Sequence, residues 1–225
     1  MKKITVLLAE DHTIVREGFR KMLELENDIE VIGEAQDGRK AVALVKKLRP
    51  AVVLMDIAMP HLNGLEATRQ ILKAVPATKV LMLSAHSDDA YVQTAIESGA
   101  AGFLLKQTSA SDVCRAIREV HRGKTFFSPS IAKHFNRLNP LLSDRVGTLN
   151  SKVAQLTSRE MEVLQLIAEG KANKETAEEL GIGIKTVEKH REHLMEKLDI
   201  HDTAGLTRYA ISAGVIESSV QLTIV

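Results

Sequence analysis

Residues 51–60 read Ala-Val-Val-Leu-Met-Asp-Ile-Ala-Met-Pro, and this stretch indicates the fold most clearly. Its first five residues form a continuous apolar run, which is typical of a parallel strand that is buried on both faces. The run stops at Asp56, and Pro60 marks the loop that follows. We therefore expect a central strand that carries a carboxylate at its carboxyl end.

Strand and helix patterns alternate on both sides of this segment. Apolar runs predict four further strands, at 4–8, 29–35, 80–83 and 102–105. Helical spacing of apolar residues predicts helices near 15–23 and over 38–48, 64–75, 90–97 and 111–122. Five strand–helix units with short connections predict an α/β fold, with a doubly wound, five-stranded parallel sheet and helices on both faces.

Five polar side chains follow strand ends in this arrangement. Glu10 and Asp11 follow the first strand, Asp56 the third, Ser84 the fourth and Lys106 the fifth. Neighbouring strands lie about 4.8 Å apart, so these side chains can converge at one edge of the sheet. Converging carboxylates repel one another unless a cation neutralises them, and oxygen ligands favour Mg²⁺. A metal, a hydroxyl and an ammonium can hold phosphoryl oxygens while Asp56 attacks phosphorus.

Each of these residues taken alone has a purely structural interpretation. Asp11 or Ser84 could cap the helix that follows it, and Lys106 could be a solvated loop lysine. The coincidence of all five at the ends of the appropriate strands favours a phosphoryl site.

Four segments of this region resemble the signature segments of a receiver domain. They are Leu8-Ala-Glu-Asp-His12, Met55-Asp-Ile-Ala-Met-Pro60, Leu83-Ser-Ala85 and Gly102-Phe-Leu-Leu-Lys106. The resemblance implies a flavodoxin-like fold in which Asp56 is the phosphoacceptor. It implies that Glu10, Asp11, Asp56 and the backbone carbonyl of Ala58 hold Mg²⁺, and that Ser84 and Lys106 receive the phosphoryl group.

Phe103 and Thr108 stand at two further positions of interest in the same family. Phe103 lies where the family places a rotameric switch aromatic, although an ordinary core phenylalanine is an equally good interpretation. Thr108 stands where many receivers have a proline, so the shape of that loop does not follow from the resemblance.

The pattern changes after residue 125. We expect a receiver domain over 1–125, a linker over 126–152 with a short helix near 131–138, and an all-α domain over 153–225. Thr157 and Glu160 have the spacing of a capping box at the start of a helix. Helices are predicted over 174–180 and 185–198, with a glycine-containing turn between them, and this pair indicates a helix-turn-helix.

Residues 156–180, 185–190 and 195–198 resemble the LuxR-type domain of the NarL/FixJ response regulators. Such a helix enters the major groove by its N-terminal end. We expect DNA contacts from Lys174, Lys185, Thr186, Glu188, Lys189, His190 and Glu192. Lys174 and Lys189 suit phosphates, Lys189 can also reach guanine, and either glutamate could accept from a cytosine amine. His190 could instead be a packed, half-buried histidine.

The family dimerises through its last helix, which implies a dimer face there. We expect it to be formed by Leu206, Tyr209, Ala210 and Ala213. The sequence departs from the family pattern at Gly183, Asp199 and Gly205. Gly205 lies inside the last helix, where glycine costs roughly 1 kcal/mol relative to alanine.

Charge and composition limit the possible functions. The chain has a net charge of +1, whereas residues 151–225 carry nine Lys and Arg against twelve Asp and Glu. A net charge of −3 counts against nucleic-acid binding by that segment, so the DNA hypothesis rests on local charge placement. The single Cys114 fits a reducing compartment, and no apolar run reaches the roughly 18 residues of a membrane span. We expect a cytoplasmic protein.

The predicted function is a phosphorylation-controlled transcriptional regulator. A sensor histidine kinase would phosphorylate Asp56 with Mg²⁺, and the homodimer would bind double-stranded DNA at two half-sites. One alternative is a Mg²⁺-dependent phosphohydrolase, although Ala58 stands where a second acid would be required. Another alternative is a DNA-binding protein that is regulated without phosphate.

Overall fold

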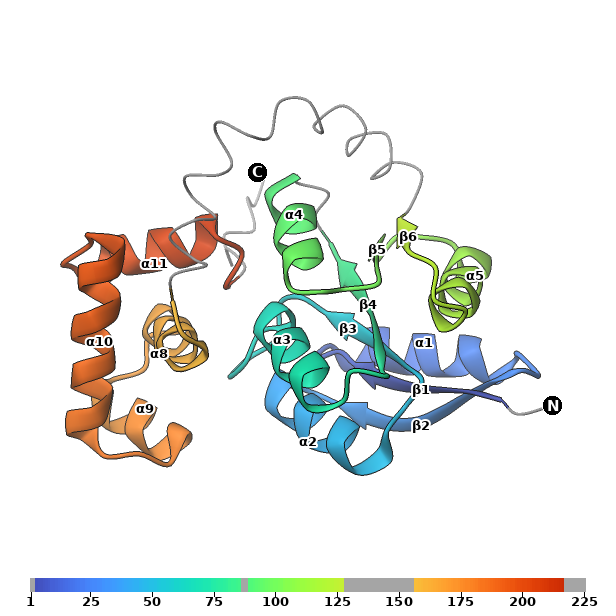
Figure 1. Ribbon diagram of the computed structural model, residues 1–225, viewed down its shortest axis with the longest axis horizontal. Helices are drawn as coiled ribbons and strands as arrows, with labels where there is room; N and C mark the ends of the chain where they lie inside the picture. Colours follow the sequence, from blue (N-terminus) through green and yellow to red (C-terminus); the bar gives the residue numbers. More distant parts are fainter. Residues whose placement is uncertain (1–2, 86–88, 128–155, 217–225) are drawn as a thin grey trace. The chain divides into compact units, whose positions relative to one another are not determined.

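The computed structural model describes residues 3–85, 89–127 and 156–216. The chain divides into two compact units, an N-terminal α/β unit and a C-terminal helical unit, which are described separately (Figure 1). Apart from its first two residues, the predicted linker lies outside the described residues, as does the short helix expected near 131–138.

The N-terminal unit is built on one parallel sheet. Its strands are β1 (Ile4–Ala9), β2 (Ile29–Ala35), β3 (Val52–Asp56), β4 (Lys79–Ser84), β5 (Gly102–Leu105) and β6 (Phe126–Phe127). Their order across the sheet is β2-β1-β3-β4-β5-β6, and every neighbouring pair is parallel. The predicted doubly wound parallel sheet is confirmed.

The prediction of five strands was one strand short. Phe126 and Phe127 lie beside Gly102 and Phe103 of β5 and form the sixth strand, at the edge of the sheet. They were assigned to the linker because two residues are too few to show the alternation by which a strand is recognised.

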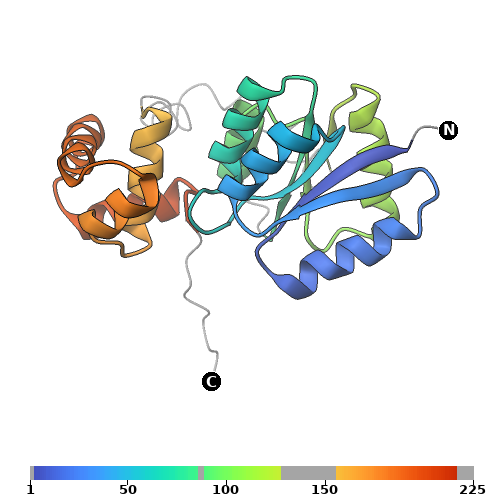
Figure 2. The same ribbon diagram turned by 90° about the horizontal axis from the view of Figure 1, so that it is seen from below.

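Helices cover both faces of the sheet (Figures 1 and 2). The helices α2 (Gly38–Leu48), α3 (Gly64–Ala74) and α4 (Asp89–Glu97) pack on one face, and α1 (Thr13–Glu24) and α5 (Ala110–His121) pack on the other. Successive side chains of a strand point to opposite faces. Val53 and Met55 of β3 therefore belong to the core beneath α2–α4, whereas Val52 and Leu54 belong to the core beneath α1 and α5.

The C-terminal unit consists of four described helices. They are α8 (Ser158–Ala168), α9 (Asn173–Leu180), α10 (Ile184–Leu198) and α11 (Thr203–Ser212). Their shared core includes Leu164, Val187, Leu194 and Leu206. The predicted capping box is present, because Thr157 Oγ1 accepts from the Glu160 amide and Glu160 Oε2 accepts from the Thr157 amide.

Gly205 has a specific role in starting α11. Its amide donates to the capping carboxylate of Asp202 over 2.7 Å. A Cβ at this position would lie 2.8 Å from Asp202 Oδ2 and 2.7 Å from Ile200 Cγ2. The glycine therefore makes room for the cap, which offsets its low helix propensity.

Within the described ranges, no helix is long and apolar enough to cross a membrane.

Candidate functional site

The carboxyl end of β3 is closely approached by the loop that follows it. The Gly64 amide donates to the Ile57 carbonyl over 2.8 Å. A Cβ on Gly64 would lie only 2.0 Å from the Asp56 carbonyl oxygen, so a larger residue would displace the loop. Asn63 caps α3 by accepting from the Glu66 amide. The close approach of the loop at Gly64 therefore holds the backbone of Asp56 and Ala58 in one position.

Three of the predicted site residues meet at this edge of the sheet. Lys106 Nζ lies 2.9 Å from Asp56 Oδ2, and it lies 3.2 Å from Glu10 Oε1 and 3.0 Å from Glu10 Oε2. The residues Asp56 and Glu10 are only 1% and 2% exposed. One ammonium group therefore bridges two buried carboxylates that come from different strands.

Burial makes the Asp56 carboxylate costly to ionise. Desolvation and the neighbouring Glu10 charge raise the pKa of Asp56 from 3.8 to about 7, although Lys106 opposes the shift. Burial lowers the pKa of Lys106, but the Asp56 and Glu10 carboxylates outweigh this effect and raise it overall. The pocket holds more negative charge than one ammonium can neutralise.

The donor atoms of the pocket fit a hard divalent cation. Glu10, Asp11, His12 and Asp56 each place a ligand atom within 4.8 Å of the others. Among the described residues, Asp56 Oδ1 is buried and has no hydrogen-bond partner. Asp11 Oδ1 and Glu10 Oε2 also accept no hydrogen bond, although Asp11 Oδ1 lies 2.9 Å from His12 Nδ1 and Glu10 Oε2 keeps its ion pair with Lys106. Buried carboxylate oxygens without donors are the ligands that Mg²⁺ takes.

The other predicted residues of the pocket lie around these groups. Ser84 is the last residue of β4 and is 1% exposed, and its carbonyl accepts from the Lys106 amide over 2.8 Å. Ala58 lies in the bend directly after Ile57. Phe103 is 1% exposed and packs in the core beneath α2–α4, as the core alternative expects. Its role as a switch stays a prediction.

Sequence reasoning missed the arginine that holds the β1–α1 loop. Arg16 is 5% exposed, and its Nη1 donates to the carbonyl of Glu10 over 2.8 Å. Its Nε donates to Glu34 Oε2 over 3.1 Å. A charged residue three and seven positions before the apolar Phe19 and Leu23 lies on the buried face of a helix, and this spacing could have identified it.

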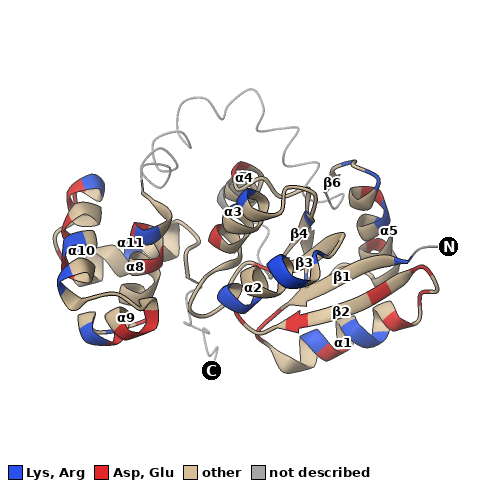
Figure 3. Cartoon of the chain, turned by 60° about the horizontal axis from the view of Figure 1, so that its bottom comes forward, with Lys and Arg blue, Asp and Glu red and all other residues tan. Residues whose placement is uncertain are grey.

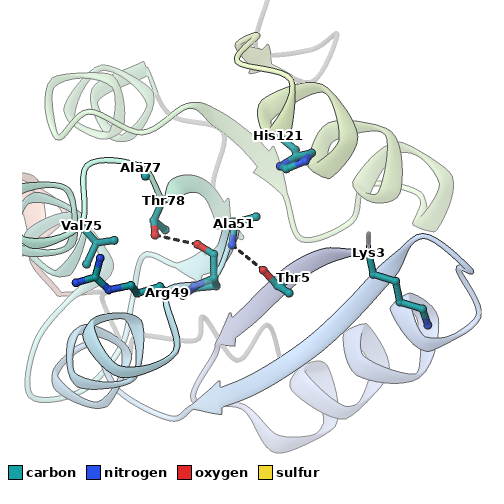
Figure 4. Close-up of a pocket in the computed structure, with 9 residues that line it drawn as sticks. Lys3, Thr5, Arg49, Ala51, Val75, Ala77, Thr78 and His121 are labelled. Carbon is teal, nitrogen blue, oxygen red and sulfur yellow. Dashed lines mark hydrogen bonds between the residues drawn. The ribbon is translucent and has the colours of Figure 1, made fainter. Parts of the chain in front are cut away.

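A cavity lies at the opposite end of the sheet from Asp56 and does not belong to this site. Its volume is about 310 Å³, and it is lined by Lys3, Thr5, Arg49, Pro50, Ala51, Val75, Ala77, Thr78 and His121. Figure 4 shows its two threonines in hydrogen bonds with backbone: Thr5 Oγ1 accepts from the Ala51 amide, and Thr78 Oγ1 donates to the Pro50 carbonyl. The polar groups of its floor are therefore already satisfied.

The helix-turn-helix of the C-terminal unit presents most of the residues expected at DNA. Exposed side chains are those of Lys174 on α9 and of Lys185, Thr186, Glu188, Lys189 and Glu192 on α10. His190 is half-buried, and the opposite face of α10 is buried in the core. Both charge signs occur along α10 in Figure 3. The outward orientation expected for these side chains is confirmed, and their contact with DNA stays a prediction.

A second residue that the sequence did not reveal fixes the position of α10. Arg191 donates to Asn173 Oδ1 of α9 over 3.3 Å and to Thr203 Oγ1 of α11 over 2.7 Å. The side chain therefore ties three helices together at one point.

The predicted dimer face does not match the structure. Leu206 and Ala210 are 0% exposed and Tyr209 is 8% exposed, because all three pack in the core of their own domain. Only Ala213 of the predicted set is partly exposed. The error arose because the stripe that packs α11 on α8 has the same helical spacing as a dimer face would have.

Comparisons with known proteins agree with this two-part organisation. Residues 6–118 match the response regulator receiver domain, and residues 154–210 match the bacterial regulatory proteins of the luxR family. The response regulator protein VraR of Staphylococcus aureus is 37% identical over 95% of this chain and 99% of its own length. The transcriptional regulatory protein DegU of Brevibacillus brevis is 35% identical over 96% of each chain.

Solved structures lead to the same family. The RcsB response regulator of Salmonella typhimurium is 27% identical, with a TM-score of 0.58, over 94% of this chain and 100% of that one. A structure of RcsB in complex with DNA gives a TM-score of 0.56 at the same identity, over 94% of this chain and 99% of that one. The chain belongs to the response regulators that join a receiver domain to a DNA-binding domain of the luxR family.

Proposed function

We propose that Asp56 accepts a phosphoryl group from a sensor histidine kinase and that this modification controls DNA binding by the C-terminal domain. The observation that carries the proposal is the state of Asp56 itself. It is almost wholly buried, one of its oxygens lies 2.9 Å from an ammonium, and the other has no hydrogen-bond partner among the described residues. Lys106 can stabilise the negative oxygens of a phosphoryl group on Asp56, and the Asp56 oxygen without a partner is open to a metal ion.

Each residue of the pocket would have a different role in the phosphoryl transfer. Asp56 supplies the attacking oxygen, so an O–P bond forms as the P–N bond of the phosphohistidine breaks. Lys106 moves from the carboxylate toward the incoming phosphoryl oxygens, and Ser84 offers a hydroxyl to them. Glu10, Asp11, Asp56 and the Ala58 carbonyl would hold Mg²⁺, which neutralises charge on the phosphoryl group when it is bound.

The phosphoryl group would change the receiver domain through small movements of side chains near Asp56. We infer that Ser84 is drawn toward the new charge and that Phe103 changes its rotamer as space opens behind Ser84. Moving a two-state equilibrium from 1:99 to 99:1 takes about 5.5 kcal/mol of differential interaction. Contacts of the phosphoryl group with Lys106, Ser84 and the metal are of a kind that can supply it.

DNA recognition would fall to α10. Lys185, Thr186 and the first amides of the helix suit phosphates, and Lys189 suits guanine acceptors. Exposed glutamates at 188 and 192 repel phosphates unless they lie at base edges, so non-specific binding should be weak and sequence preference strict. A dimer would read two half-sites about one helical turn apart. The name of the RcsB–DNA complex supports DNA binding by this type of domain.

The two alternative functions are less well supported. A phosphohydrolase of the aspartyl-phosphate type needs a second acid near the nucleophile, and Ala58 is two residues beyond Asp56. Regulation without phosphate leaves the buried group of Asp56, Glu10 and Lys106 without a function, because a buried ion pair contributes little net stability.

Acceptance of the phosphoryl group can be tested directly on the full chain. The protein is incubated with Mg²⁺ and a small-molecule phosphodonor, and intact mass and hydroxylamine sensitivity report an acyl phosphate. We expect one phosphoryl group on the wild type, none on Asp56→Asn, and much slower or less stable modification of Lys106→Met. Exposed Lys40→Met serves as the matched control. Modification of Asp56→Asn to the wild-type level would contradict the assignment.

A further inference from the structure

His12 joins the carboxylate pocket from the start of α1. Its backbone amide donates to Glu10 Oε1 over 3.1 Å. Its ring Nδ1 lies 3.0 Å from Glu10 Oε1 and 2.9 Å from Asp11 Oδ1. The His12 side chain is 65% exposed, whereas that of Glu10 is 2% exposed. The imidazole therefore lies on the solvent side of two acidic groups, and its Nδ1 faces one carboxylate oxygen of each.

This imidazole changes the chemistry of the donor set. One ligand atom each from Glu10, Asp11, His12 and Asp56 lies within 4.8 Å of the others. An all-oxygen set suits Mg²⁺, but an imidazole nitrogen suits ions of the zinc, cobalt and nickel class. A second observation points to a cation, because Asp56 Oδ1 is buried without a hydrogen-bond partner among the described residues and belongs to a residue that is 1% exposed.

The distances between Nδ1 and the two carboxylate oxygens allow a metal ion to bind between them. Zinc binds imidazole nitrogen at about 2.0–2.1 Å and carboxylate oxygen at about 2.0–2.2 Å, so two such ligands in tetrahedral geometry lie roughly 3.4 Å apart. Nδ1 lies 2.9 and 3.0 Å from the two carboxylate oxygens. A widening of a few tenths of an ångström is therefore sufficient, and the exposed His12 ring is the partner that can move.

We propose that His12, Asp11 and Glu10, with Asp56 within reach, form a site for a borderline transition-metal ion that competes with Mg²⁺. Asp11 and Asp56 cannot serve both ions in the same geometry. Transition-metal binding therefore holds the pocket in a state that cannot accept a phosphoryl group. This consequence rests on the proposed function, whereas the binding of the ion does not.

The binding step is tested with Co²⁺ alone on the full-length protein. Visible absorption and calorimetry are measured for the wild type, for His12→Asn and for His121→Asn. His12→Asn removes the imidazole and places a favourable N-cap residue at the start of α1. His121 is an exposed histidine at the other end of the sheet and is the matched control. Far-ultraviolet circular dichroism verifies that each variant is folded.

We expect one Co²⁺ per chain with ligand-field absorption in the wild type and in His121→Asn. Loss of an outer-shell partner already costs about 10–100-fold in metal affinity, so His12→Asn should weaken Co²⁺ by at least about tenfold. Its Mg²⁺ affinity should change by less than about threefold, because Mg²⁺ does not favour nitrogen ligands. Equal Co²⁺ affinity in wild type and His12→Asn would overturn the proposal, as would loss of the site in His121→Asn.

The competition step uses the phosphodonor assay at fixed Mg²⁺ with increasing Zn²⁺. Zn²⁺ should inhibit modification of the wild type and of His121→Asn at concentrations that leave His12→Asn active. Equal inhibition of all three proteins would overturn the role of His12 in competition. A wild type that is not modified in Mg²⁺ alone would contradict the proposed function, while the Co²⁺ result would still decide the metal site.

Discussion

At the scale of single residues, the protein keeps an acidic side chain where its charge is unfavourable. Asp56 is 1% exposed beside Glu10, and burial raises its pKa to about 7. Lys106 neutralises part of the charge but leaves one Asp56 oxygen without a partner in the described structure. The stability of the folded domain is therefore reduced at the position that the proposed chemistry requires, as is common at functional sites.

Asp56→Asn should consequently be more stable than the wild type in metal-free buffer. The folded pKa of about 7 lies above the unfolded value of 3.8, so the wild type loses stability as the pH rises between them. The advantage of the variant should be absent near pH 4 and complete above pH 7. One pKa unit corresponds to about 1.4 kcal/mol, and loss of the Lys106 contact offsets part of the gain, so we expect about 1–2 kcal/mol.

Denaturant unfolding with EDTA at several pH values measures this difference. The exposed Glu30→Gln serves as the control and should not show it. Addition of Mg²⁺ should stabilise the wild type and remove most of the advantage of Asp56→Asn. A variant that is less stable than the wild type at pH 8 without metal would contradict this description of the pocket.

The residues that the sequence revealed are those whose position follows from topology. Asp56, Ser84 and Lys106 could be predicted because the carboxyl ends of all parallel strands lie at the same edge of the sheet. The role of His12 could not be predicted, because it depends on the direction in which a side chain turns after the strand. The helical spacing of Arg16 could have shown that it is buried, but not that it holds the Glu10 carbonyl. For Phe103 the sequence left two interpretations open, and the structure shows that the side chain is buried in the core.

At the scale of elements, the ends of helices and strands follow local signals. The predicted bounds of α2 and β2 agree with the structure to the residue, and Thr157 caps the helix that it was expected to cap. The failures concern elements without such signals. The edge strand β6 is two residues long, and the buried stripe of α11 has the same spacing as a dimer face.

Two helical glycines, Gly18 and Gly205, allow the effect of helix propensity on stability to be distinguished from the effect of side-chain packing. A Cβ on Gly18 of α1 would meet nothing within 4 Å, so Gly18→Ala should raise stability by about 0.5–1 kcal/mol. A Cβ on Gly205 would collide with the Asp202 cap and with Ile200, so Gly205→Ala should lower it by about 1 kcal/mol or more. Denaturant unfolding of both variants measures the two changes in the free energy of unfolding, which should have opposite signs. Stabilisation by Gly205→Ala would show that the cap does not need the glycine.

At the scale of the whole molecule, the protein joins a receiver domain to a DNA-binding domain that carries little favourable charge. The C-terminal segment 151–225 has a net charge of −3, so general attraction to DNA is weak. We expect binding to depend on the local arrangement of α10 and on pairing of two copies at two half-sites. The proposed control by Asp56 would be effective for such a domain, because a modest change in dimer population would alter occupancy strongly.

The most direct test of this coupling is DNA selection from random duplexes by the full chain. Wild type and Asp56→Ala are each measured with and without beryllofluoride, a phosphoryl mimic, in the presence of Mg²⁺. We predict that the mimic tightens binding to a sequence with two half-sites in the wild type only. Equal binding in all four conditions would contradict the central claim that Asp56 controls the DNA-binding domain.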